Sequence, residues 1–151
     1  MSEQKHYTPA PEDFRVGFEC EILKWIDGVL IPEKWEPRII SAEGVSIQIE
    51  IAVNRAKKDA IRVPYLTAEQ IEAEGWEKEQ IGQHWLKNIT GFKYILTAAN
   101  TVTQEIETNC PHCWIIQRIN PETWIIPNFQ VFRGTIRCIN DLRLICKLLG
   151  I

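Results

Sequence analysis

The chain has 151 residues, which is enough for one domain or a domain with a small appendage, and its formal net charge is −3. This acidic balance argues against non-specific nucleic-acid binding, so DNA is not expected to be the main partner. No apolar run approaches the ~18 residues that a membrane-spanning helix needs, so no membrane partner is expected either.

The N-terminal residues are polar, contain Pro9 and Pro11, and lack the apolar stretch of a secretory signal. We therefore expect a flexible tail over residues 1–12, one domain over residues 13–151, and a cytoplasmic location. The five cysteines are an odd number, which fits a reducing compartment better than a disulfide framework.

Alternating apolar and polar residues predict strands in the first third of the chain. Residues 14–22 alternate strictly and predict a half-buried strand. Glu19 and Glu21 lie on its polar side, where they form either a carboxylate pair for acid–base or metal chemistry or, more simply, two solvated side chains. Asp27 and Gly28 predict a hairpin turn. Residues 37–41 and 46–53 predict two further strands.

The middle of the chain mixes charged and apolar segments. Residues 54–59 include Arg55, Lys57 and Lys58, which indicates a solvated connector or, alternatively, a loop that contacts phosphate. Thr67 and Gln70 match a capping box and predict a short helix that Gly75 ends. Residues 77–87 predict a weak helix or an irregular loop.

The rest of the chain predicts short strands in series and a closing helix. The strands are expected at residues 92–98, 102–107, 114–119, 124–126 and 129–136. Asn140 is expected to cap the helix, whose apolar stripe comprises Leu142, Ile145, Cys146 and Leu149. The predicted fold class is α+β: a mostly antiparallel twisted sheet or partial barrel with two short helices, the last at the C-terminus.

One tetrapeptide, Cys110, Pro111, His112 and Cys113, suggests specific chemistry. In a thiol–disulfide oxidoreductase such a pair of cysteines begins a helix, but the residues that follow here predict a strand. A second interpretation is a zinc site in which Cys110, Cys113 and His112 supply ligands, although no second ligand pair accompanies them. The third, which we favour, is a turn without metal or redox function, and therefore no cofactor.

A ligand pocket is a separate hypothesis. The chain has six tryptophans, and residues 110–151 carry five Lys or Arg against two Asp or Glu. Aromatic rings and guanidinium groups together are what stacking on a base and gripping a phosphate need. The candidate ligand-binding residues are Trp76, Trp85, Arg118, Arg133 and Arg137. The simpler alternative is that most of the tryptophans pack in the core and that the arginines are solvated or paired with acidic residues.

Three segments, residues 13–21, 61–76 and 134–151, together resemble small uncharacterised proteins of Bacteroidota phages and prophages. The resemblance spans most of the chain but leaves out residues 110–113. It implies a setting in the host cytoplasm and supplies no assigned reaction.

The leading hypothesis is a non-enzymatic phage-type binding protein. It would act in counter-defence, by sequestering a small nucleotide signal or by blocking a host protein. The alternative is a thiol-redox or zinc-binding protein centred on residues 110–113. A third option is a protein-binding module that forms a homo-oligomer through an exposed strand edge at residues 102–107.

Overall fold

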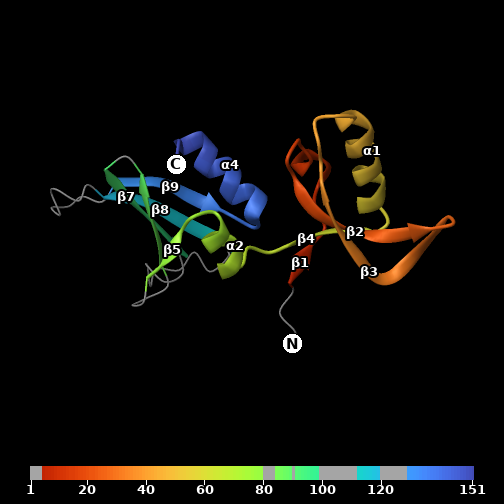
Figure 1. Ribbon diagram of the computed structural model, residues 1–151, viewed down its shortest axis with the longest axis horizontal. Coiled ribbons are helices and arrows are strands. Elements are labelled where there is room, and N and C mark those ends of the chain that lie inside the picture. Colours follow the sequence, from red (N-terminus) through yellow and green to blue (C-terminus); the bar gives the residue numbers. More distant parts are fainter. Residues whose placement is uncertain (1–4, 80–83, 90, 99–111, 120–128) are drawn as a thin grey trace. The chain divides into compact units, whose positions relative to one another are not determined.

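A computed structural model describes residues 5–79, 84–89, 91–98, 112–119 and 129–151 (Figure 1). The chain divides into two compact units, Met1–Tyr65 and Leu66–Ile151. Each unit contains its own antiparallel sheet, so the predicted α+β class is confirmed, with two sheets rather than one. The predicted extents of the tail and the domain stay predictions. Within the described ranges, no helix has the length and apolar character needed to cross a membrane.

The sheet of the first unit has the strand order β1 (His6–Tyr7), β4 (Ile61–Pro64), β2 (Glu19–Ile26) and β3 (Val29–Ile39). A short 3-10 helix, η1 (Pro11–Asp13), follows β1. The predicted hairpin turn is confirmed, because Ile26 pairs with Val29 and both Asp27 and Gly28 have positive φ. Positive φ at both central positions is the type I′ geometry that suits the twist of a hairpin.

The strand predicted at residues 46–53 is wrong, because this segment lies inside helix α1 (Val45–Ala56). Ile47, Ile49 and Ile51 alternate as strand residues would, yet the same segment also carries a helical stripe. The buried or half-buried positions of that stripe follow the helical spacing of three and four residues: Val45, Gln48, Ile49, Ala52, Val53 and Ala56. The stripe faces the sheet, and Ile47 and Ile51 are left 65% and 48% exposed.

The first predicted strand also begins later than expected, at Glu19 rather than Phe14. Gly17 has a φ of +85°, which interrupts an extended backbone, and the rings of Phe14 and Phe18 pack edge to face with centroids 5.5 Å apart. Both rings are buried and contribute to the core of the first unit.

The second unit contains a five-stranded antiparallel meander. Its strands are β5 (Glu77–Lys78), β6 (His84–Ile89), β7 (Phe92–Ala98), β8 (Cys113–Ile119) and β9 (Phe129–Thr135). β7 is confirmed with the predicted bounds, whereas the weak helix or loop predicted at residues 77–87 is wrong, because β5 and part of β6 occupy it. The strands predicted at residues 102–107 and 124–126 lie outside the described residues.

Two helices accompany this sheet. In α2 (Ala68–Ala73) the predicted capping box is confirmed, since the Gln70 N–H donates to Thr67 Oγ at 3.3 Å and the Thr67 N–H donates to Gln70 Oε1 at 3.2 Å. α4 (Ile139–Leu149) crosses the sheet, and its predicted apolar stripe is confirmed by the buried Leu142 and Cys146 (Figure 1). The helix begins after Cys138 rather than at Asn140, which is itself helical and buried.

Candidate functional site: the cleft beside α1

A cleft of about 450 Å³ lies between α1 and the sheet of the first unit. We call it the α1 cleft. Its apolar lining comes from β2, β4, the end of β3 and one side of α1, and its polar lining from side chains with N–H, O–H or guanidinium groups. The lining residues are Cys20, Ile22, Arg38, Ile39, Ile40, Ser41, Gln48, Ile51, Ala52, Arg55 and Ile61. An apolar cleft with a few polar groups is the usual form of a small-ligand site.

The floor of the cleft follows from strand register. Ile22 of β2 stands opposite Ile61 of β4, so the two side chains lie on the same face of the sheet. Cys20, two residues before Ile22, continues that face and is only 6% exposed. Above it, Ala52 presents a small side chain, and this leaves room between the helix and the strands.

Two arginines give the cleft its charge. Arg55, in the last turn of α1, donates from Nη1 to the Leu23 carbonyl oxygen at 2.8 Å, which fixes its position. Arg38 stands on β3, and its side chain is 62% exposed with Glu36 Oε2 3.9 Å away. An exposed pair at that distance contributes little, so Arg38 retains most of its attraction for an anion.

The other polar groups are held by a network at the start of α1. Gln48 Oε1 accepts from the Ser41 N–H at 3.0 Å, while Gln48 Nε2 donates to Ser41 Oγ at 2.7 Å and to the Glu43 carbonyl at 2.6 Å. The network ties the β3–α1 connection to the helix. This edge of the cleft is therefore ordered before any ligand arrives.

The described lining of the cleft contains one thiol, that of Cys20. No Asp, Glu or His belongs to the described residues that line the cleft. Burial raises the pKa of the Cys20 thiol from 9.0 to about 11, so the thiol is protonated at neutral pH. A protonated thiol is a weak nucleophile, and Cys20 therefore serves as an apolar part of the wall.

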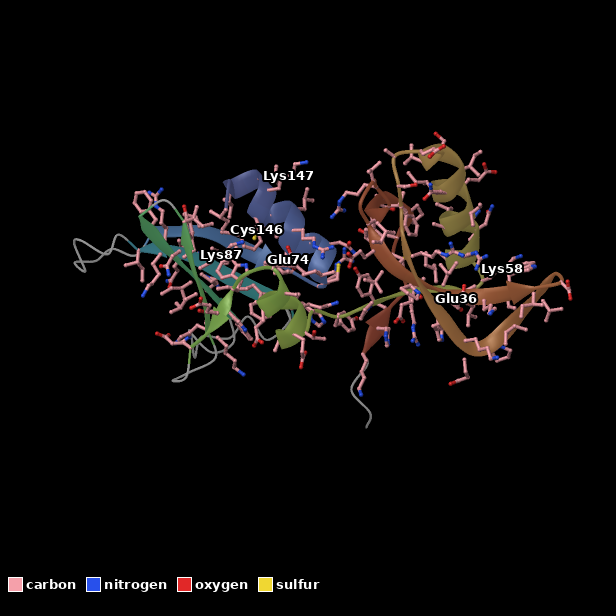
Figure 2. All side chains as sticks on the ribbon, in the orientation of Figure 1. Glu36, Lys58, Glu74, Lys87, Cys146 and Lys147 are labelled. Carbon is pink, nitrogen blue, oxygen red and sulfur yellow. The ribbon has the colours of Figure 1, made fainter. Side chains whose placement is uncertain are left out.

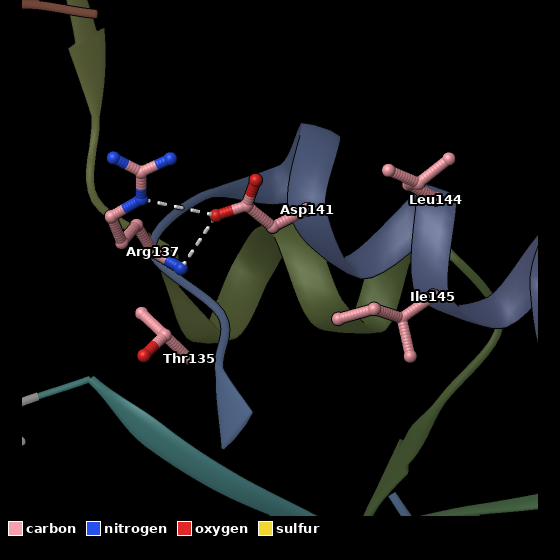
Figure 3. A pocket seen from close by; sticks show the side chains of 5 residues that line it. All are labelled: Thr135, Arg137, Asp141, Leu144 and Ile145. Carbon is pink, nitrogen blue, oxygen red and sulfur yellow. Dashed lines mark hydrogen bonds and ion pairs between the residues drawn. The ribbon is translucent and has the colours of Figure 1, made fainter. Parts of the chain in front are cut away.

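A second hollow, of about 470 Å³, lies in the second unit beside the start of α4 (Figure 3). It is lined by Thr135, Arg137, Asp141, Leu144 and Ile145. The Asp141 carboxylate accepts from the Arg137 backbone N–H at 2.9 Å and lies 3.5 Å from Arg137 Nε. One cation and one anion give this hollow no net charge, whereas the α1 cleft of similar volume carries two cations. The α1 cleft is therefore the stronger candidate.

Glu21, which the sequence leaves either solvated or in a carboxylate pair with Glu19, lies on the face of the first sheet opposite the α1 cleft. Glu21 Oε2 accepts from Arg62 Nε and lies 3.4 Å from His6 Nε2. Burial lowers the pKa of His6, and Arg62 adds to this effect, so the imidazole is neutral at pH 7. The guanidinium of Arg62 also lies 4.1 Å from the centroid of the Trp35 ring. Glu21 thus belongs to a paired cluster rather than to a carboxylate pair with Glu19.

The two tryptophans predicted to bind ligand are buried in the core of the second unit. Trp76 is 1% exposed and Trp85 is 8% exposed. Trp85 packs against Trp114, with ring centroids 5.8 Å apart. The Lys87 ammonium lies 5.7 Å from the Trp76 ring and donates to the Glu74 carbonyl at 3.0 Å (Figure 2). Both rings fill the interior.

The three predicted arginines do not converge on one place. Arg118 on β8 lies 4.8 Å from the Phe92 ring centroid. Arg133 on β9 stands opposite Ile115, three residues from Arg118, so side-chain alternation directs the two arginines to opposite faces of the sheet. Arg137 follows β9 and pairs with Asp141 in the second hollow.

The cysteine tetrapeptide lies partly outside the described residues, since Cys110 and Pro111 belong to residues 99–111. Cys113 is the first residue of β8, so the backbone beyond it is extended, as predicted. The helix that would lower a thiol pKa in an oxidoreductase is therefore not formed by residues 113–119. Within the ranges that the structure describes, no three His, Cys, Asp or Glu side chains are grouped to hold a metal.

The sequence did not single out Arg38, Ser41 or Gln48. They come from β3, the β3–α1 connection and α1, which strand alternation alone does not bring together. A signal for Arg55 was present, in the alternative that residues 54–59 contact phosphate. Comparisons with known protein families, with curated proteins and with solved structures find no match to this chain.

Proposed function

We propose that this protein is a non-enzymatic binding protein that sequesters a small anionic ligand, of nucleotide type, in the α1 cleft. The observation that supports the proposal is that two guanidinium groups and an apolar floor line the same cleft, which has a volume of about 450 Å³. Arginine binds phosphate and carboxylate through paired N–H donors, while an apolar floor favours an organic body over a bare ion.

The electrostatic balance of the chain supports the same proposal. A protein with a net charge of −3 repels anions at long range, so an anion site needs a local excess of positive charge. Arg38 and Arg55 provide that excess on the cleft wall. Since the Ser41–Gln48 network already orders one edge, less conformational entropy is lost when a ligand binds.

The resemblance to phage proteins suggests a setting for such binding. A phage protein that holds a nucleotide tightly and does not convert it would remove a signal on which the host depends. We therefore propose counter-defence by sequestration as the biological function.

The first test is a thermal-shift screen of the full chain with ADP-ribose and cyclic dinucleotides. A ligand at one hundred times its Kd stabilises the folded state by about 2.7 kcal/mol, or ~5–10 °C for a chain of this size. We expect such a shift with at least one of these compounds. If none of them shifts the melting temperature at millimolar concentration, the nucleotide proposal is wrong.

Two charge-reversal variants locate the site. Arg38→Glu should weaken binding at least ~10-fold, because it replaces an attractive charge on the cleft wall with a repulsive one. Lys147→Glu makes the same change in net charge on an exposed residue of the second unit, and it should leave the affinity unchanged. Equal losses in both variants would mean that net charge, and not the cleft, determines binding.

A second candidate function, blocking a host protein, is favoured by the isoleucines beside the cleft. Ile39, Ile47 and Ile51 are 61%, 65% and 48% exposed, and exposed apolar residues in a group are typical of protein interfaces. An Ile47→Asp variant separates the two functions. It should abolish capture of a host protein in a pull-down if blocking is the function, whereas nucleotide binding should be unchanged.

A further inference from the structure

One exposed aromatic residue lies beside the α1 cleft. Trp25, near the end of β2, is 45% exposed. The Arg55 guanidinium lies 5.8 Å from its ring centroid and the Lys58 ammonium lies 5.6 Å away. Both distances are within the range of cation–π attraction. Arg55 therefore belongs both to the cleft lining and to the surroundings of this ring.

Trp25 stands where the β2–β3 hairpin is irregular. Leu23 is opposite Trp35 whereas Trp25 is opposite Leu30, so the extra residues lie on β3. Irregularities of this kind are common beside functional sites. Trp35, by contrast, stands opposite Leu23 in the regular part of the hairpin and lies against Arg62. The two tryptophans thus have different basic partners.

We propose that Trp25 is a stacking platform for the base of a nucleotide whose phosphate lies between Arg55 and Arg38. This inference rests on the proposed function and narrows it, since a fatty acid or other aliphatic anion would gain nothing from an aromatic platform. Every nucleobase presents a π face that stacks on an indole ring. Arg55, held by the Leu23 carbonyl, is the link between the base site and the phosphate site.

Lys58 has a different function in this arrangement. It lies two residues beyond the end of α1, and its ammonium is carried on a flexible four-carbon stem (Figure 2). A lysine of this kind follows a phosphate as a point charge, whereas a guanidinium held at one place selects geometry. Residues 54–59, which include Arg55 and Lys58, would then contact phosphate. This is the second of the two interpretations of that segment given by the sequence.

Calorimetric titration of the full chain with ADP-ribose and with cyclic di-AMP tests the platform. Trp25→Leu should lower the affinity for the nucleotide by about 5- to 100-fold, the range expected for the loss of one base-stacking partner. Trp25→Phe keeps an aromatic ring and should retain most of the affinity. Trp35→Leu is the matched control, because Trp35 lies against Arg62 rather than Arg55. This variant should bind nucleotide as tightly as the unaltered protein. The melting temperature of each variant verifies folding.

The outcomes separate the platform from the proposed function. If the unaltered protein binds nucleotide, Arg38→Glu weakens it, and Trp25→Leu binds as tightly as the unaltered protein, the platform is wrong while the cleft proposal stands. Equal losses in Trp25→Leu and Trp35→Leu would also overturn it, because the effect would then not be local. If neither nucleotide binds to the unaltered protein, both proposals fail together.

Discussion

Cys20 is a buried thiol in the floor of the proposed ligand site. Its thiol is buried in the floor of the α1 cleft, and burial raises its pKa to about 11. A residue in this state offers bulk and polarizability to a ligand but little thiolate to attack it. The same side chain in a solvated, electropositive site would be a candidate nucleophile.

The raised pKa of Cys20 predicts a pH dependence of stability. The folded-state pKa, about 11, lies above the value of 9.0 for an unperturbed thiol. The unfolded chain therefore loses its proton first, and the free energy of unfolding should fall as pH rises from about 9 to about 11. Urea unfolding of the unaltered protein and of Cys20→Ala at pH 8, 9.5 and 11 measures this.

Cys20→Ala should lose part of this dependence of the free energy of unfolding on pH. It should not lose all of it, because burial also raises the pKa of Cys146 in the second unit. Identical slopes in the two proteins would contradict the assignment of Cys20 as a protonated, buried thiol.

At the scale of elements, α1 decides what the first unit can bind. Its buried stripe packs on the sheet, its small Ala52 leaves space for the cleft, and its last turn supplies Arg55. The helix leaves a cleft with an ordered edge.

Two substitutions distinguish the helix from the strand that the alternation of isoleucines predicted. In a strand, Ile47→Ala and Ile49→Ala would remove equivalent inward side chains and lower the free energy of unfolding by similar amounts. In α1, Ile47 is 65% exposed, whereas Ile49 is half-buried on the stripe that faces the sheet. We expect Ile47→Ala to be neutral or to stabilise by a few tenths of a kcal/mol, and Ile49→Ala to cost ~1–3 kcal/mol.

Chemical denaturation followed by circular dichroism measures both changes in the free energy of unfolding. A loss of more than about 1 kcal/mol in Ile47→Ala would contradict the helix.

Local signals were enough to predict several elements. The Asp27–Gly28 turn, the Thr67–Gln70 capping box and the stripe of α4 each depend on residues close in sequence, and each is confirmed. The failure at α1 has a physical cause, because Ile47, Ile49, Ile51 and Val53 satisfy strand alternation while the helical stripe is also present. Packing against the sheet, which is not local, decides between them.

The candidate site was harder to predict for the same reason. Arg38 and Arg55 are brought together only when β3 turns back into α1, and the sequence contains no motif that joins them. The tryptophans suggested a ligand site, yet Trp76 and Trp85 are buried in a core. Composition alone does not separate a buried indole from one at the surface, such as Trp25.

At the scale of the whole molecule, the two units differ in what they expose. Of the large apolar side chains that the structure shows as exposed, those of residues 1–65 lie in α1, at the end of β3, around the β2–β3 hairpin and at Val16. In residues 66–151 they are Leu144 and Leu148 of α4. The described core of the second unit is continuous, and its buried tryptophans give it stability rather than binding groups. We therefore place the proposed ligand site in the first unit.

The most direct test of this assignment is a titration of the ¹⁵N-labelled full chain with the nucleotide that gives the largest thermal shift. Backbone amide resonances report where the ligand lies. We expect the perturbed resonances to cluster at Cys20, Trp25, Arg38, Gln48 and Arg55. Perturbations confined to residues 66–151, or none in the α1 cleft at saturating ligand, would contradict this assignment.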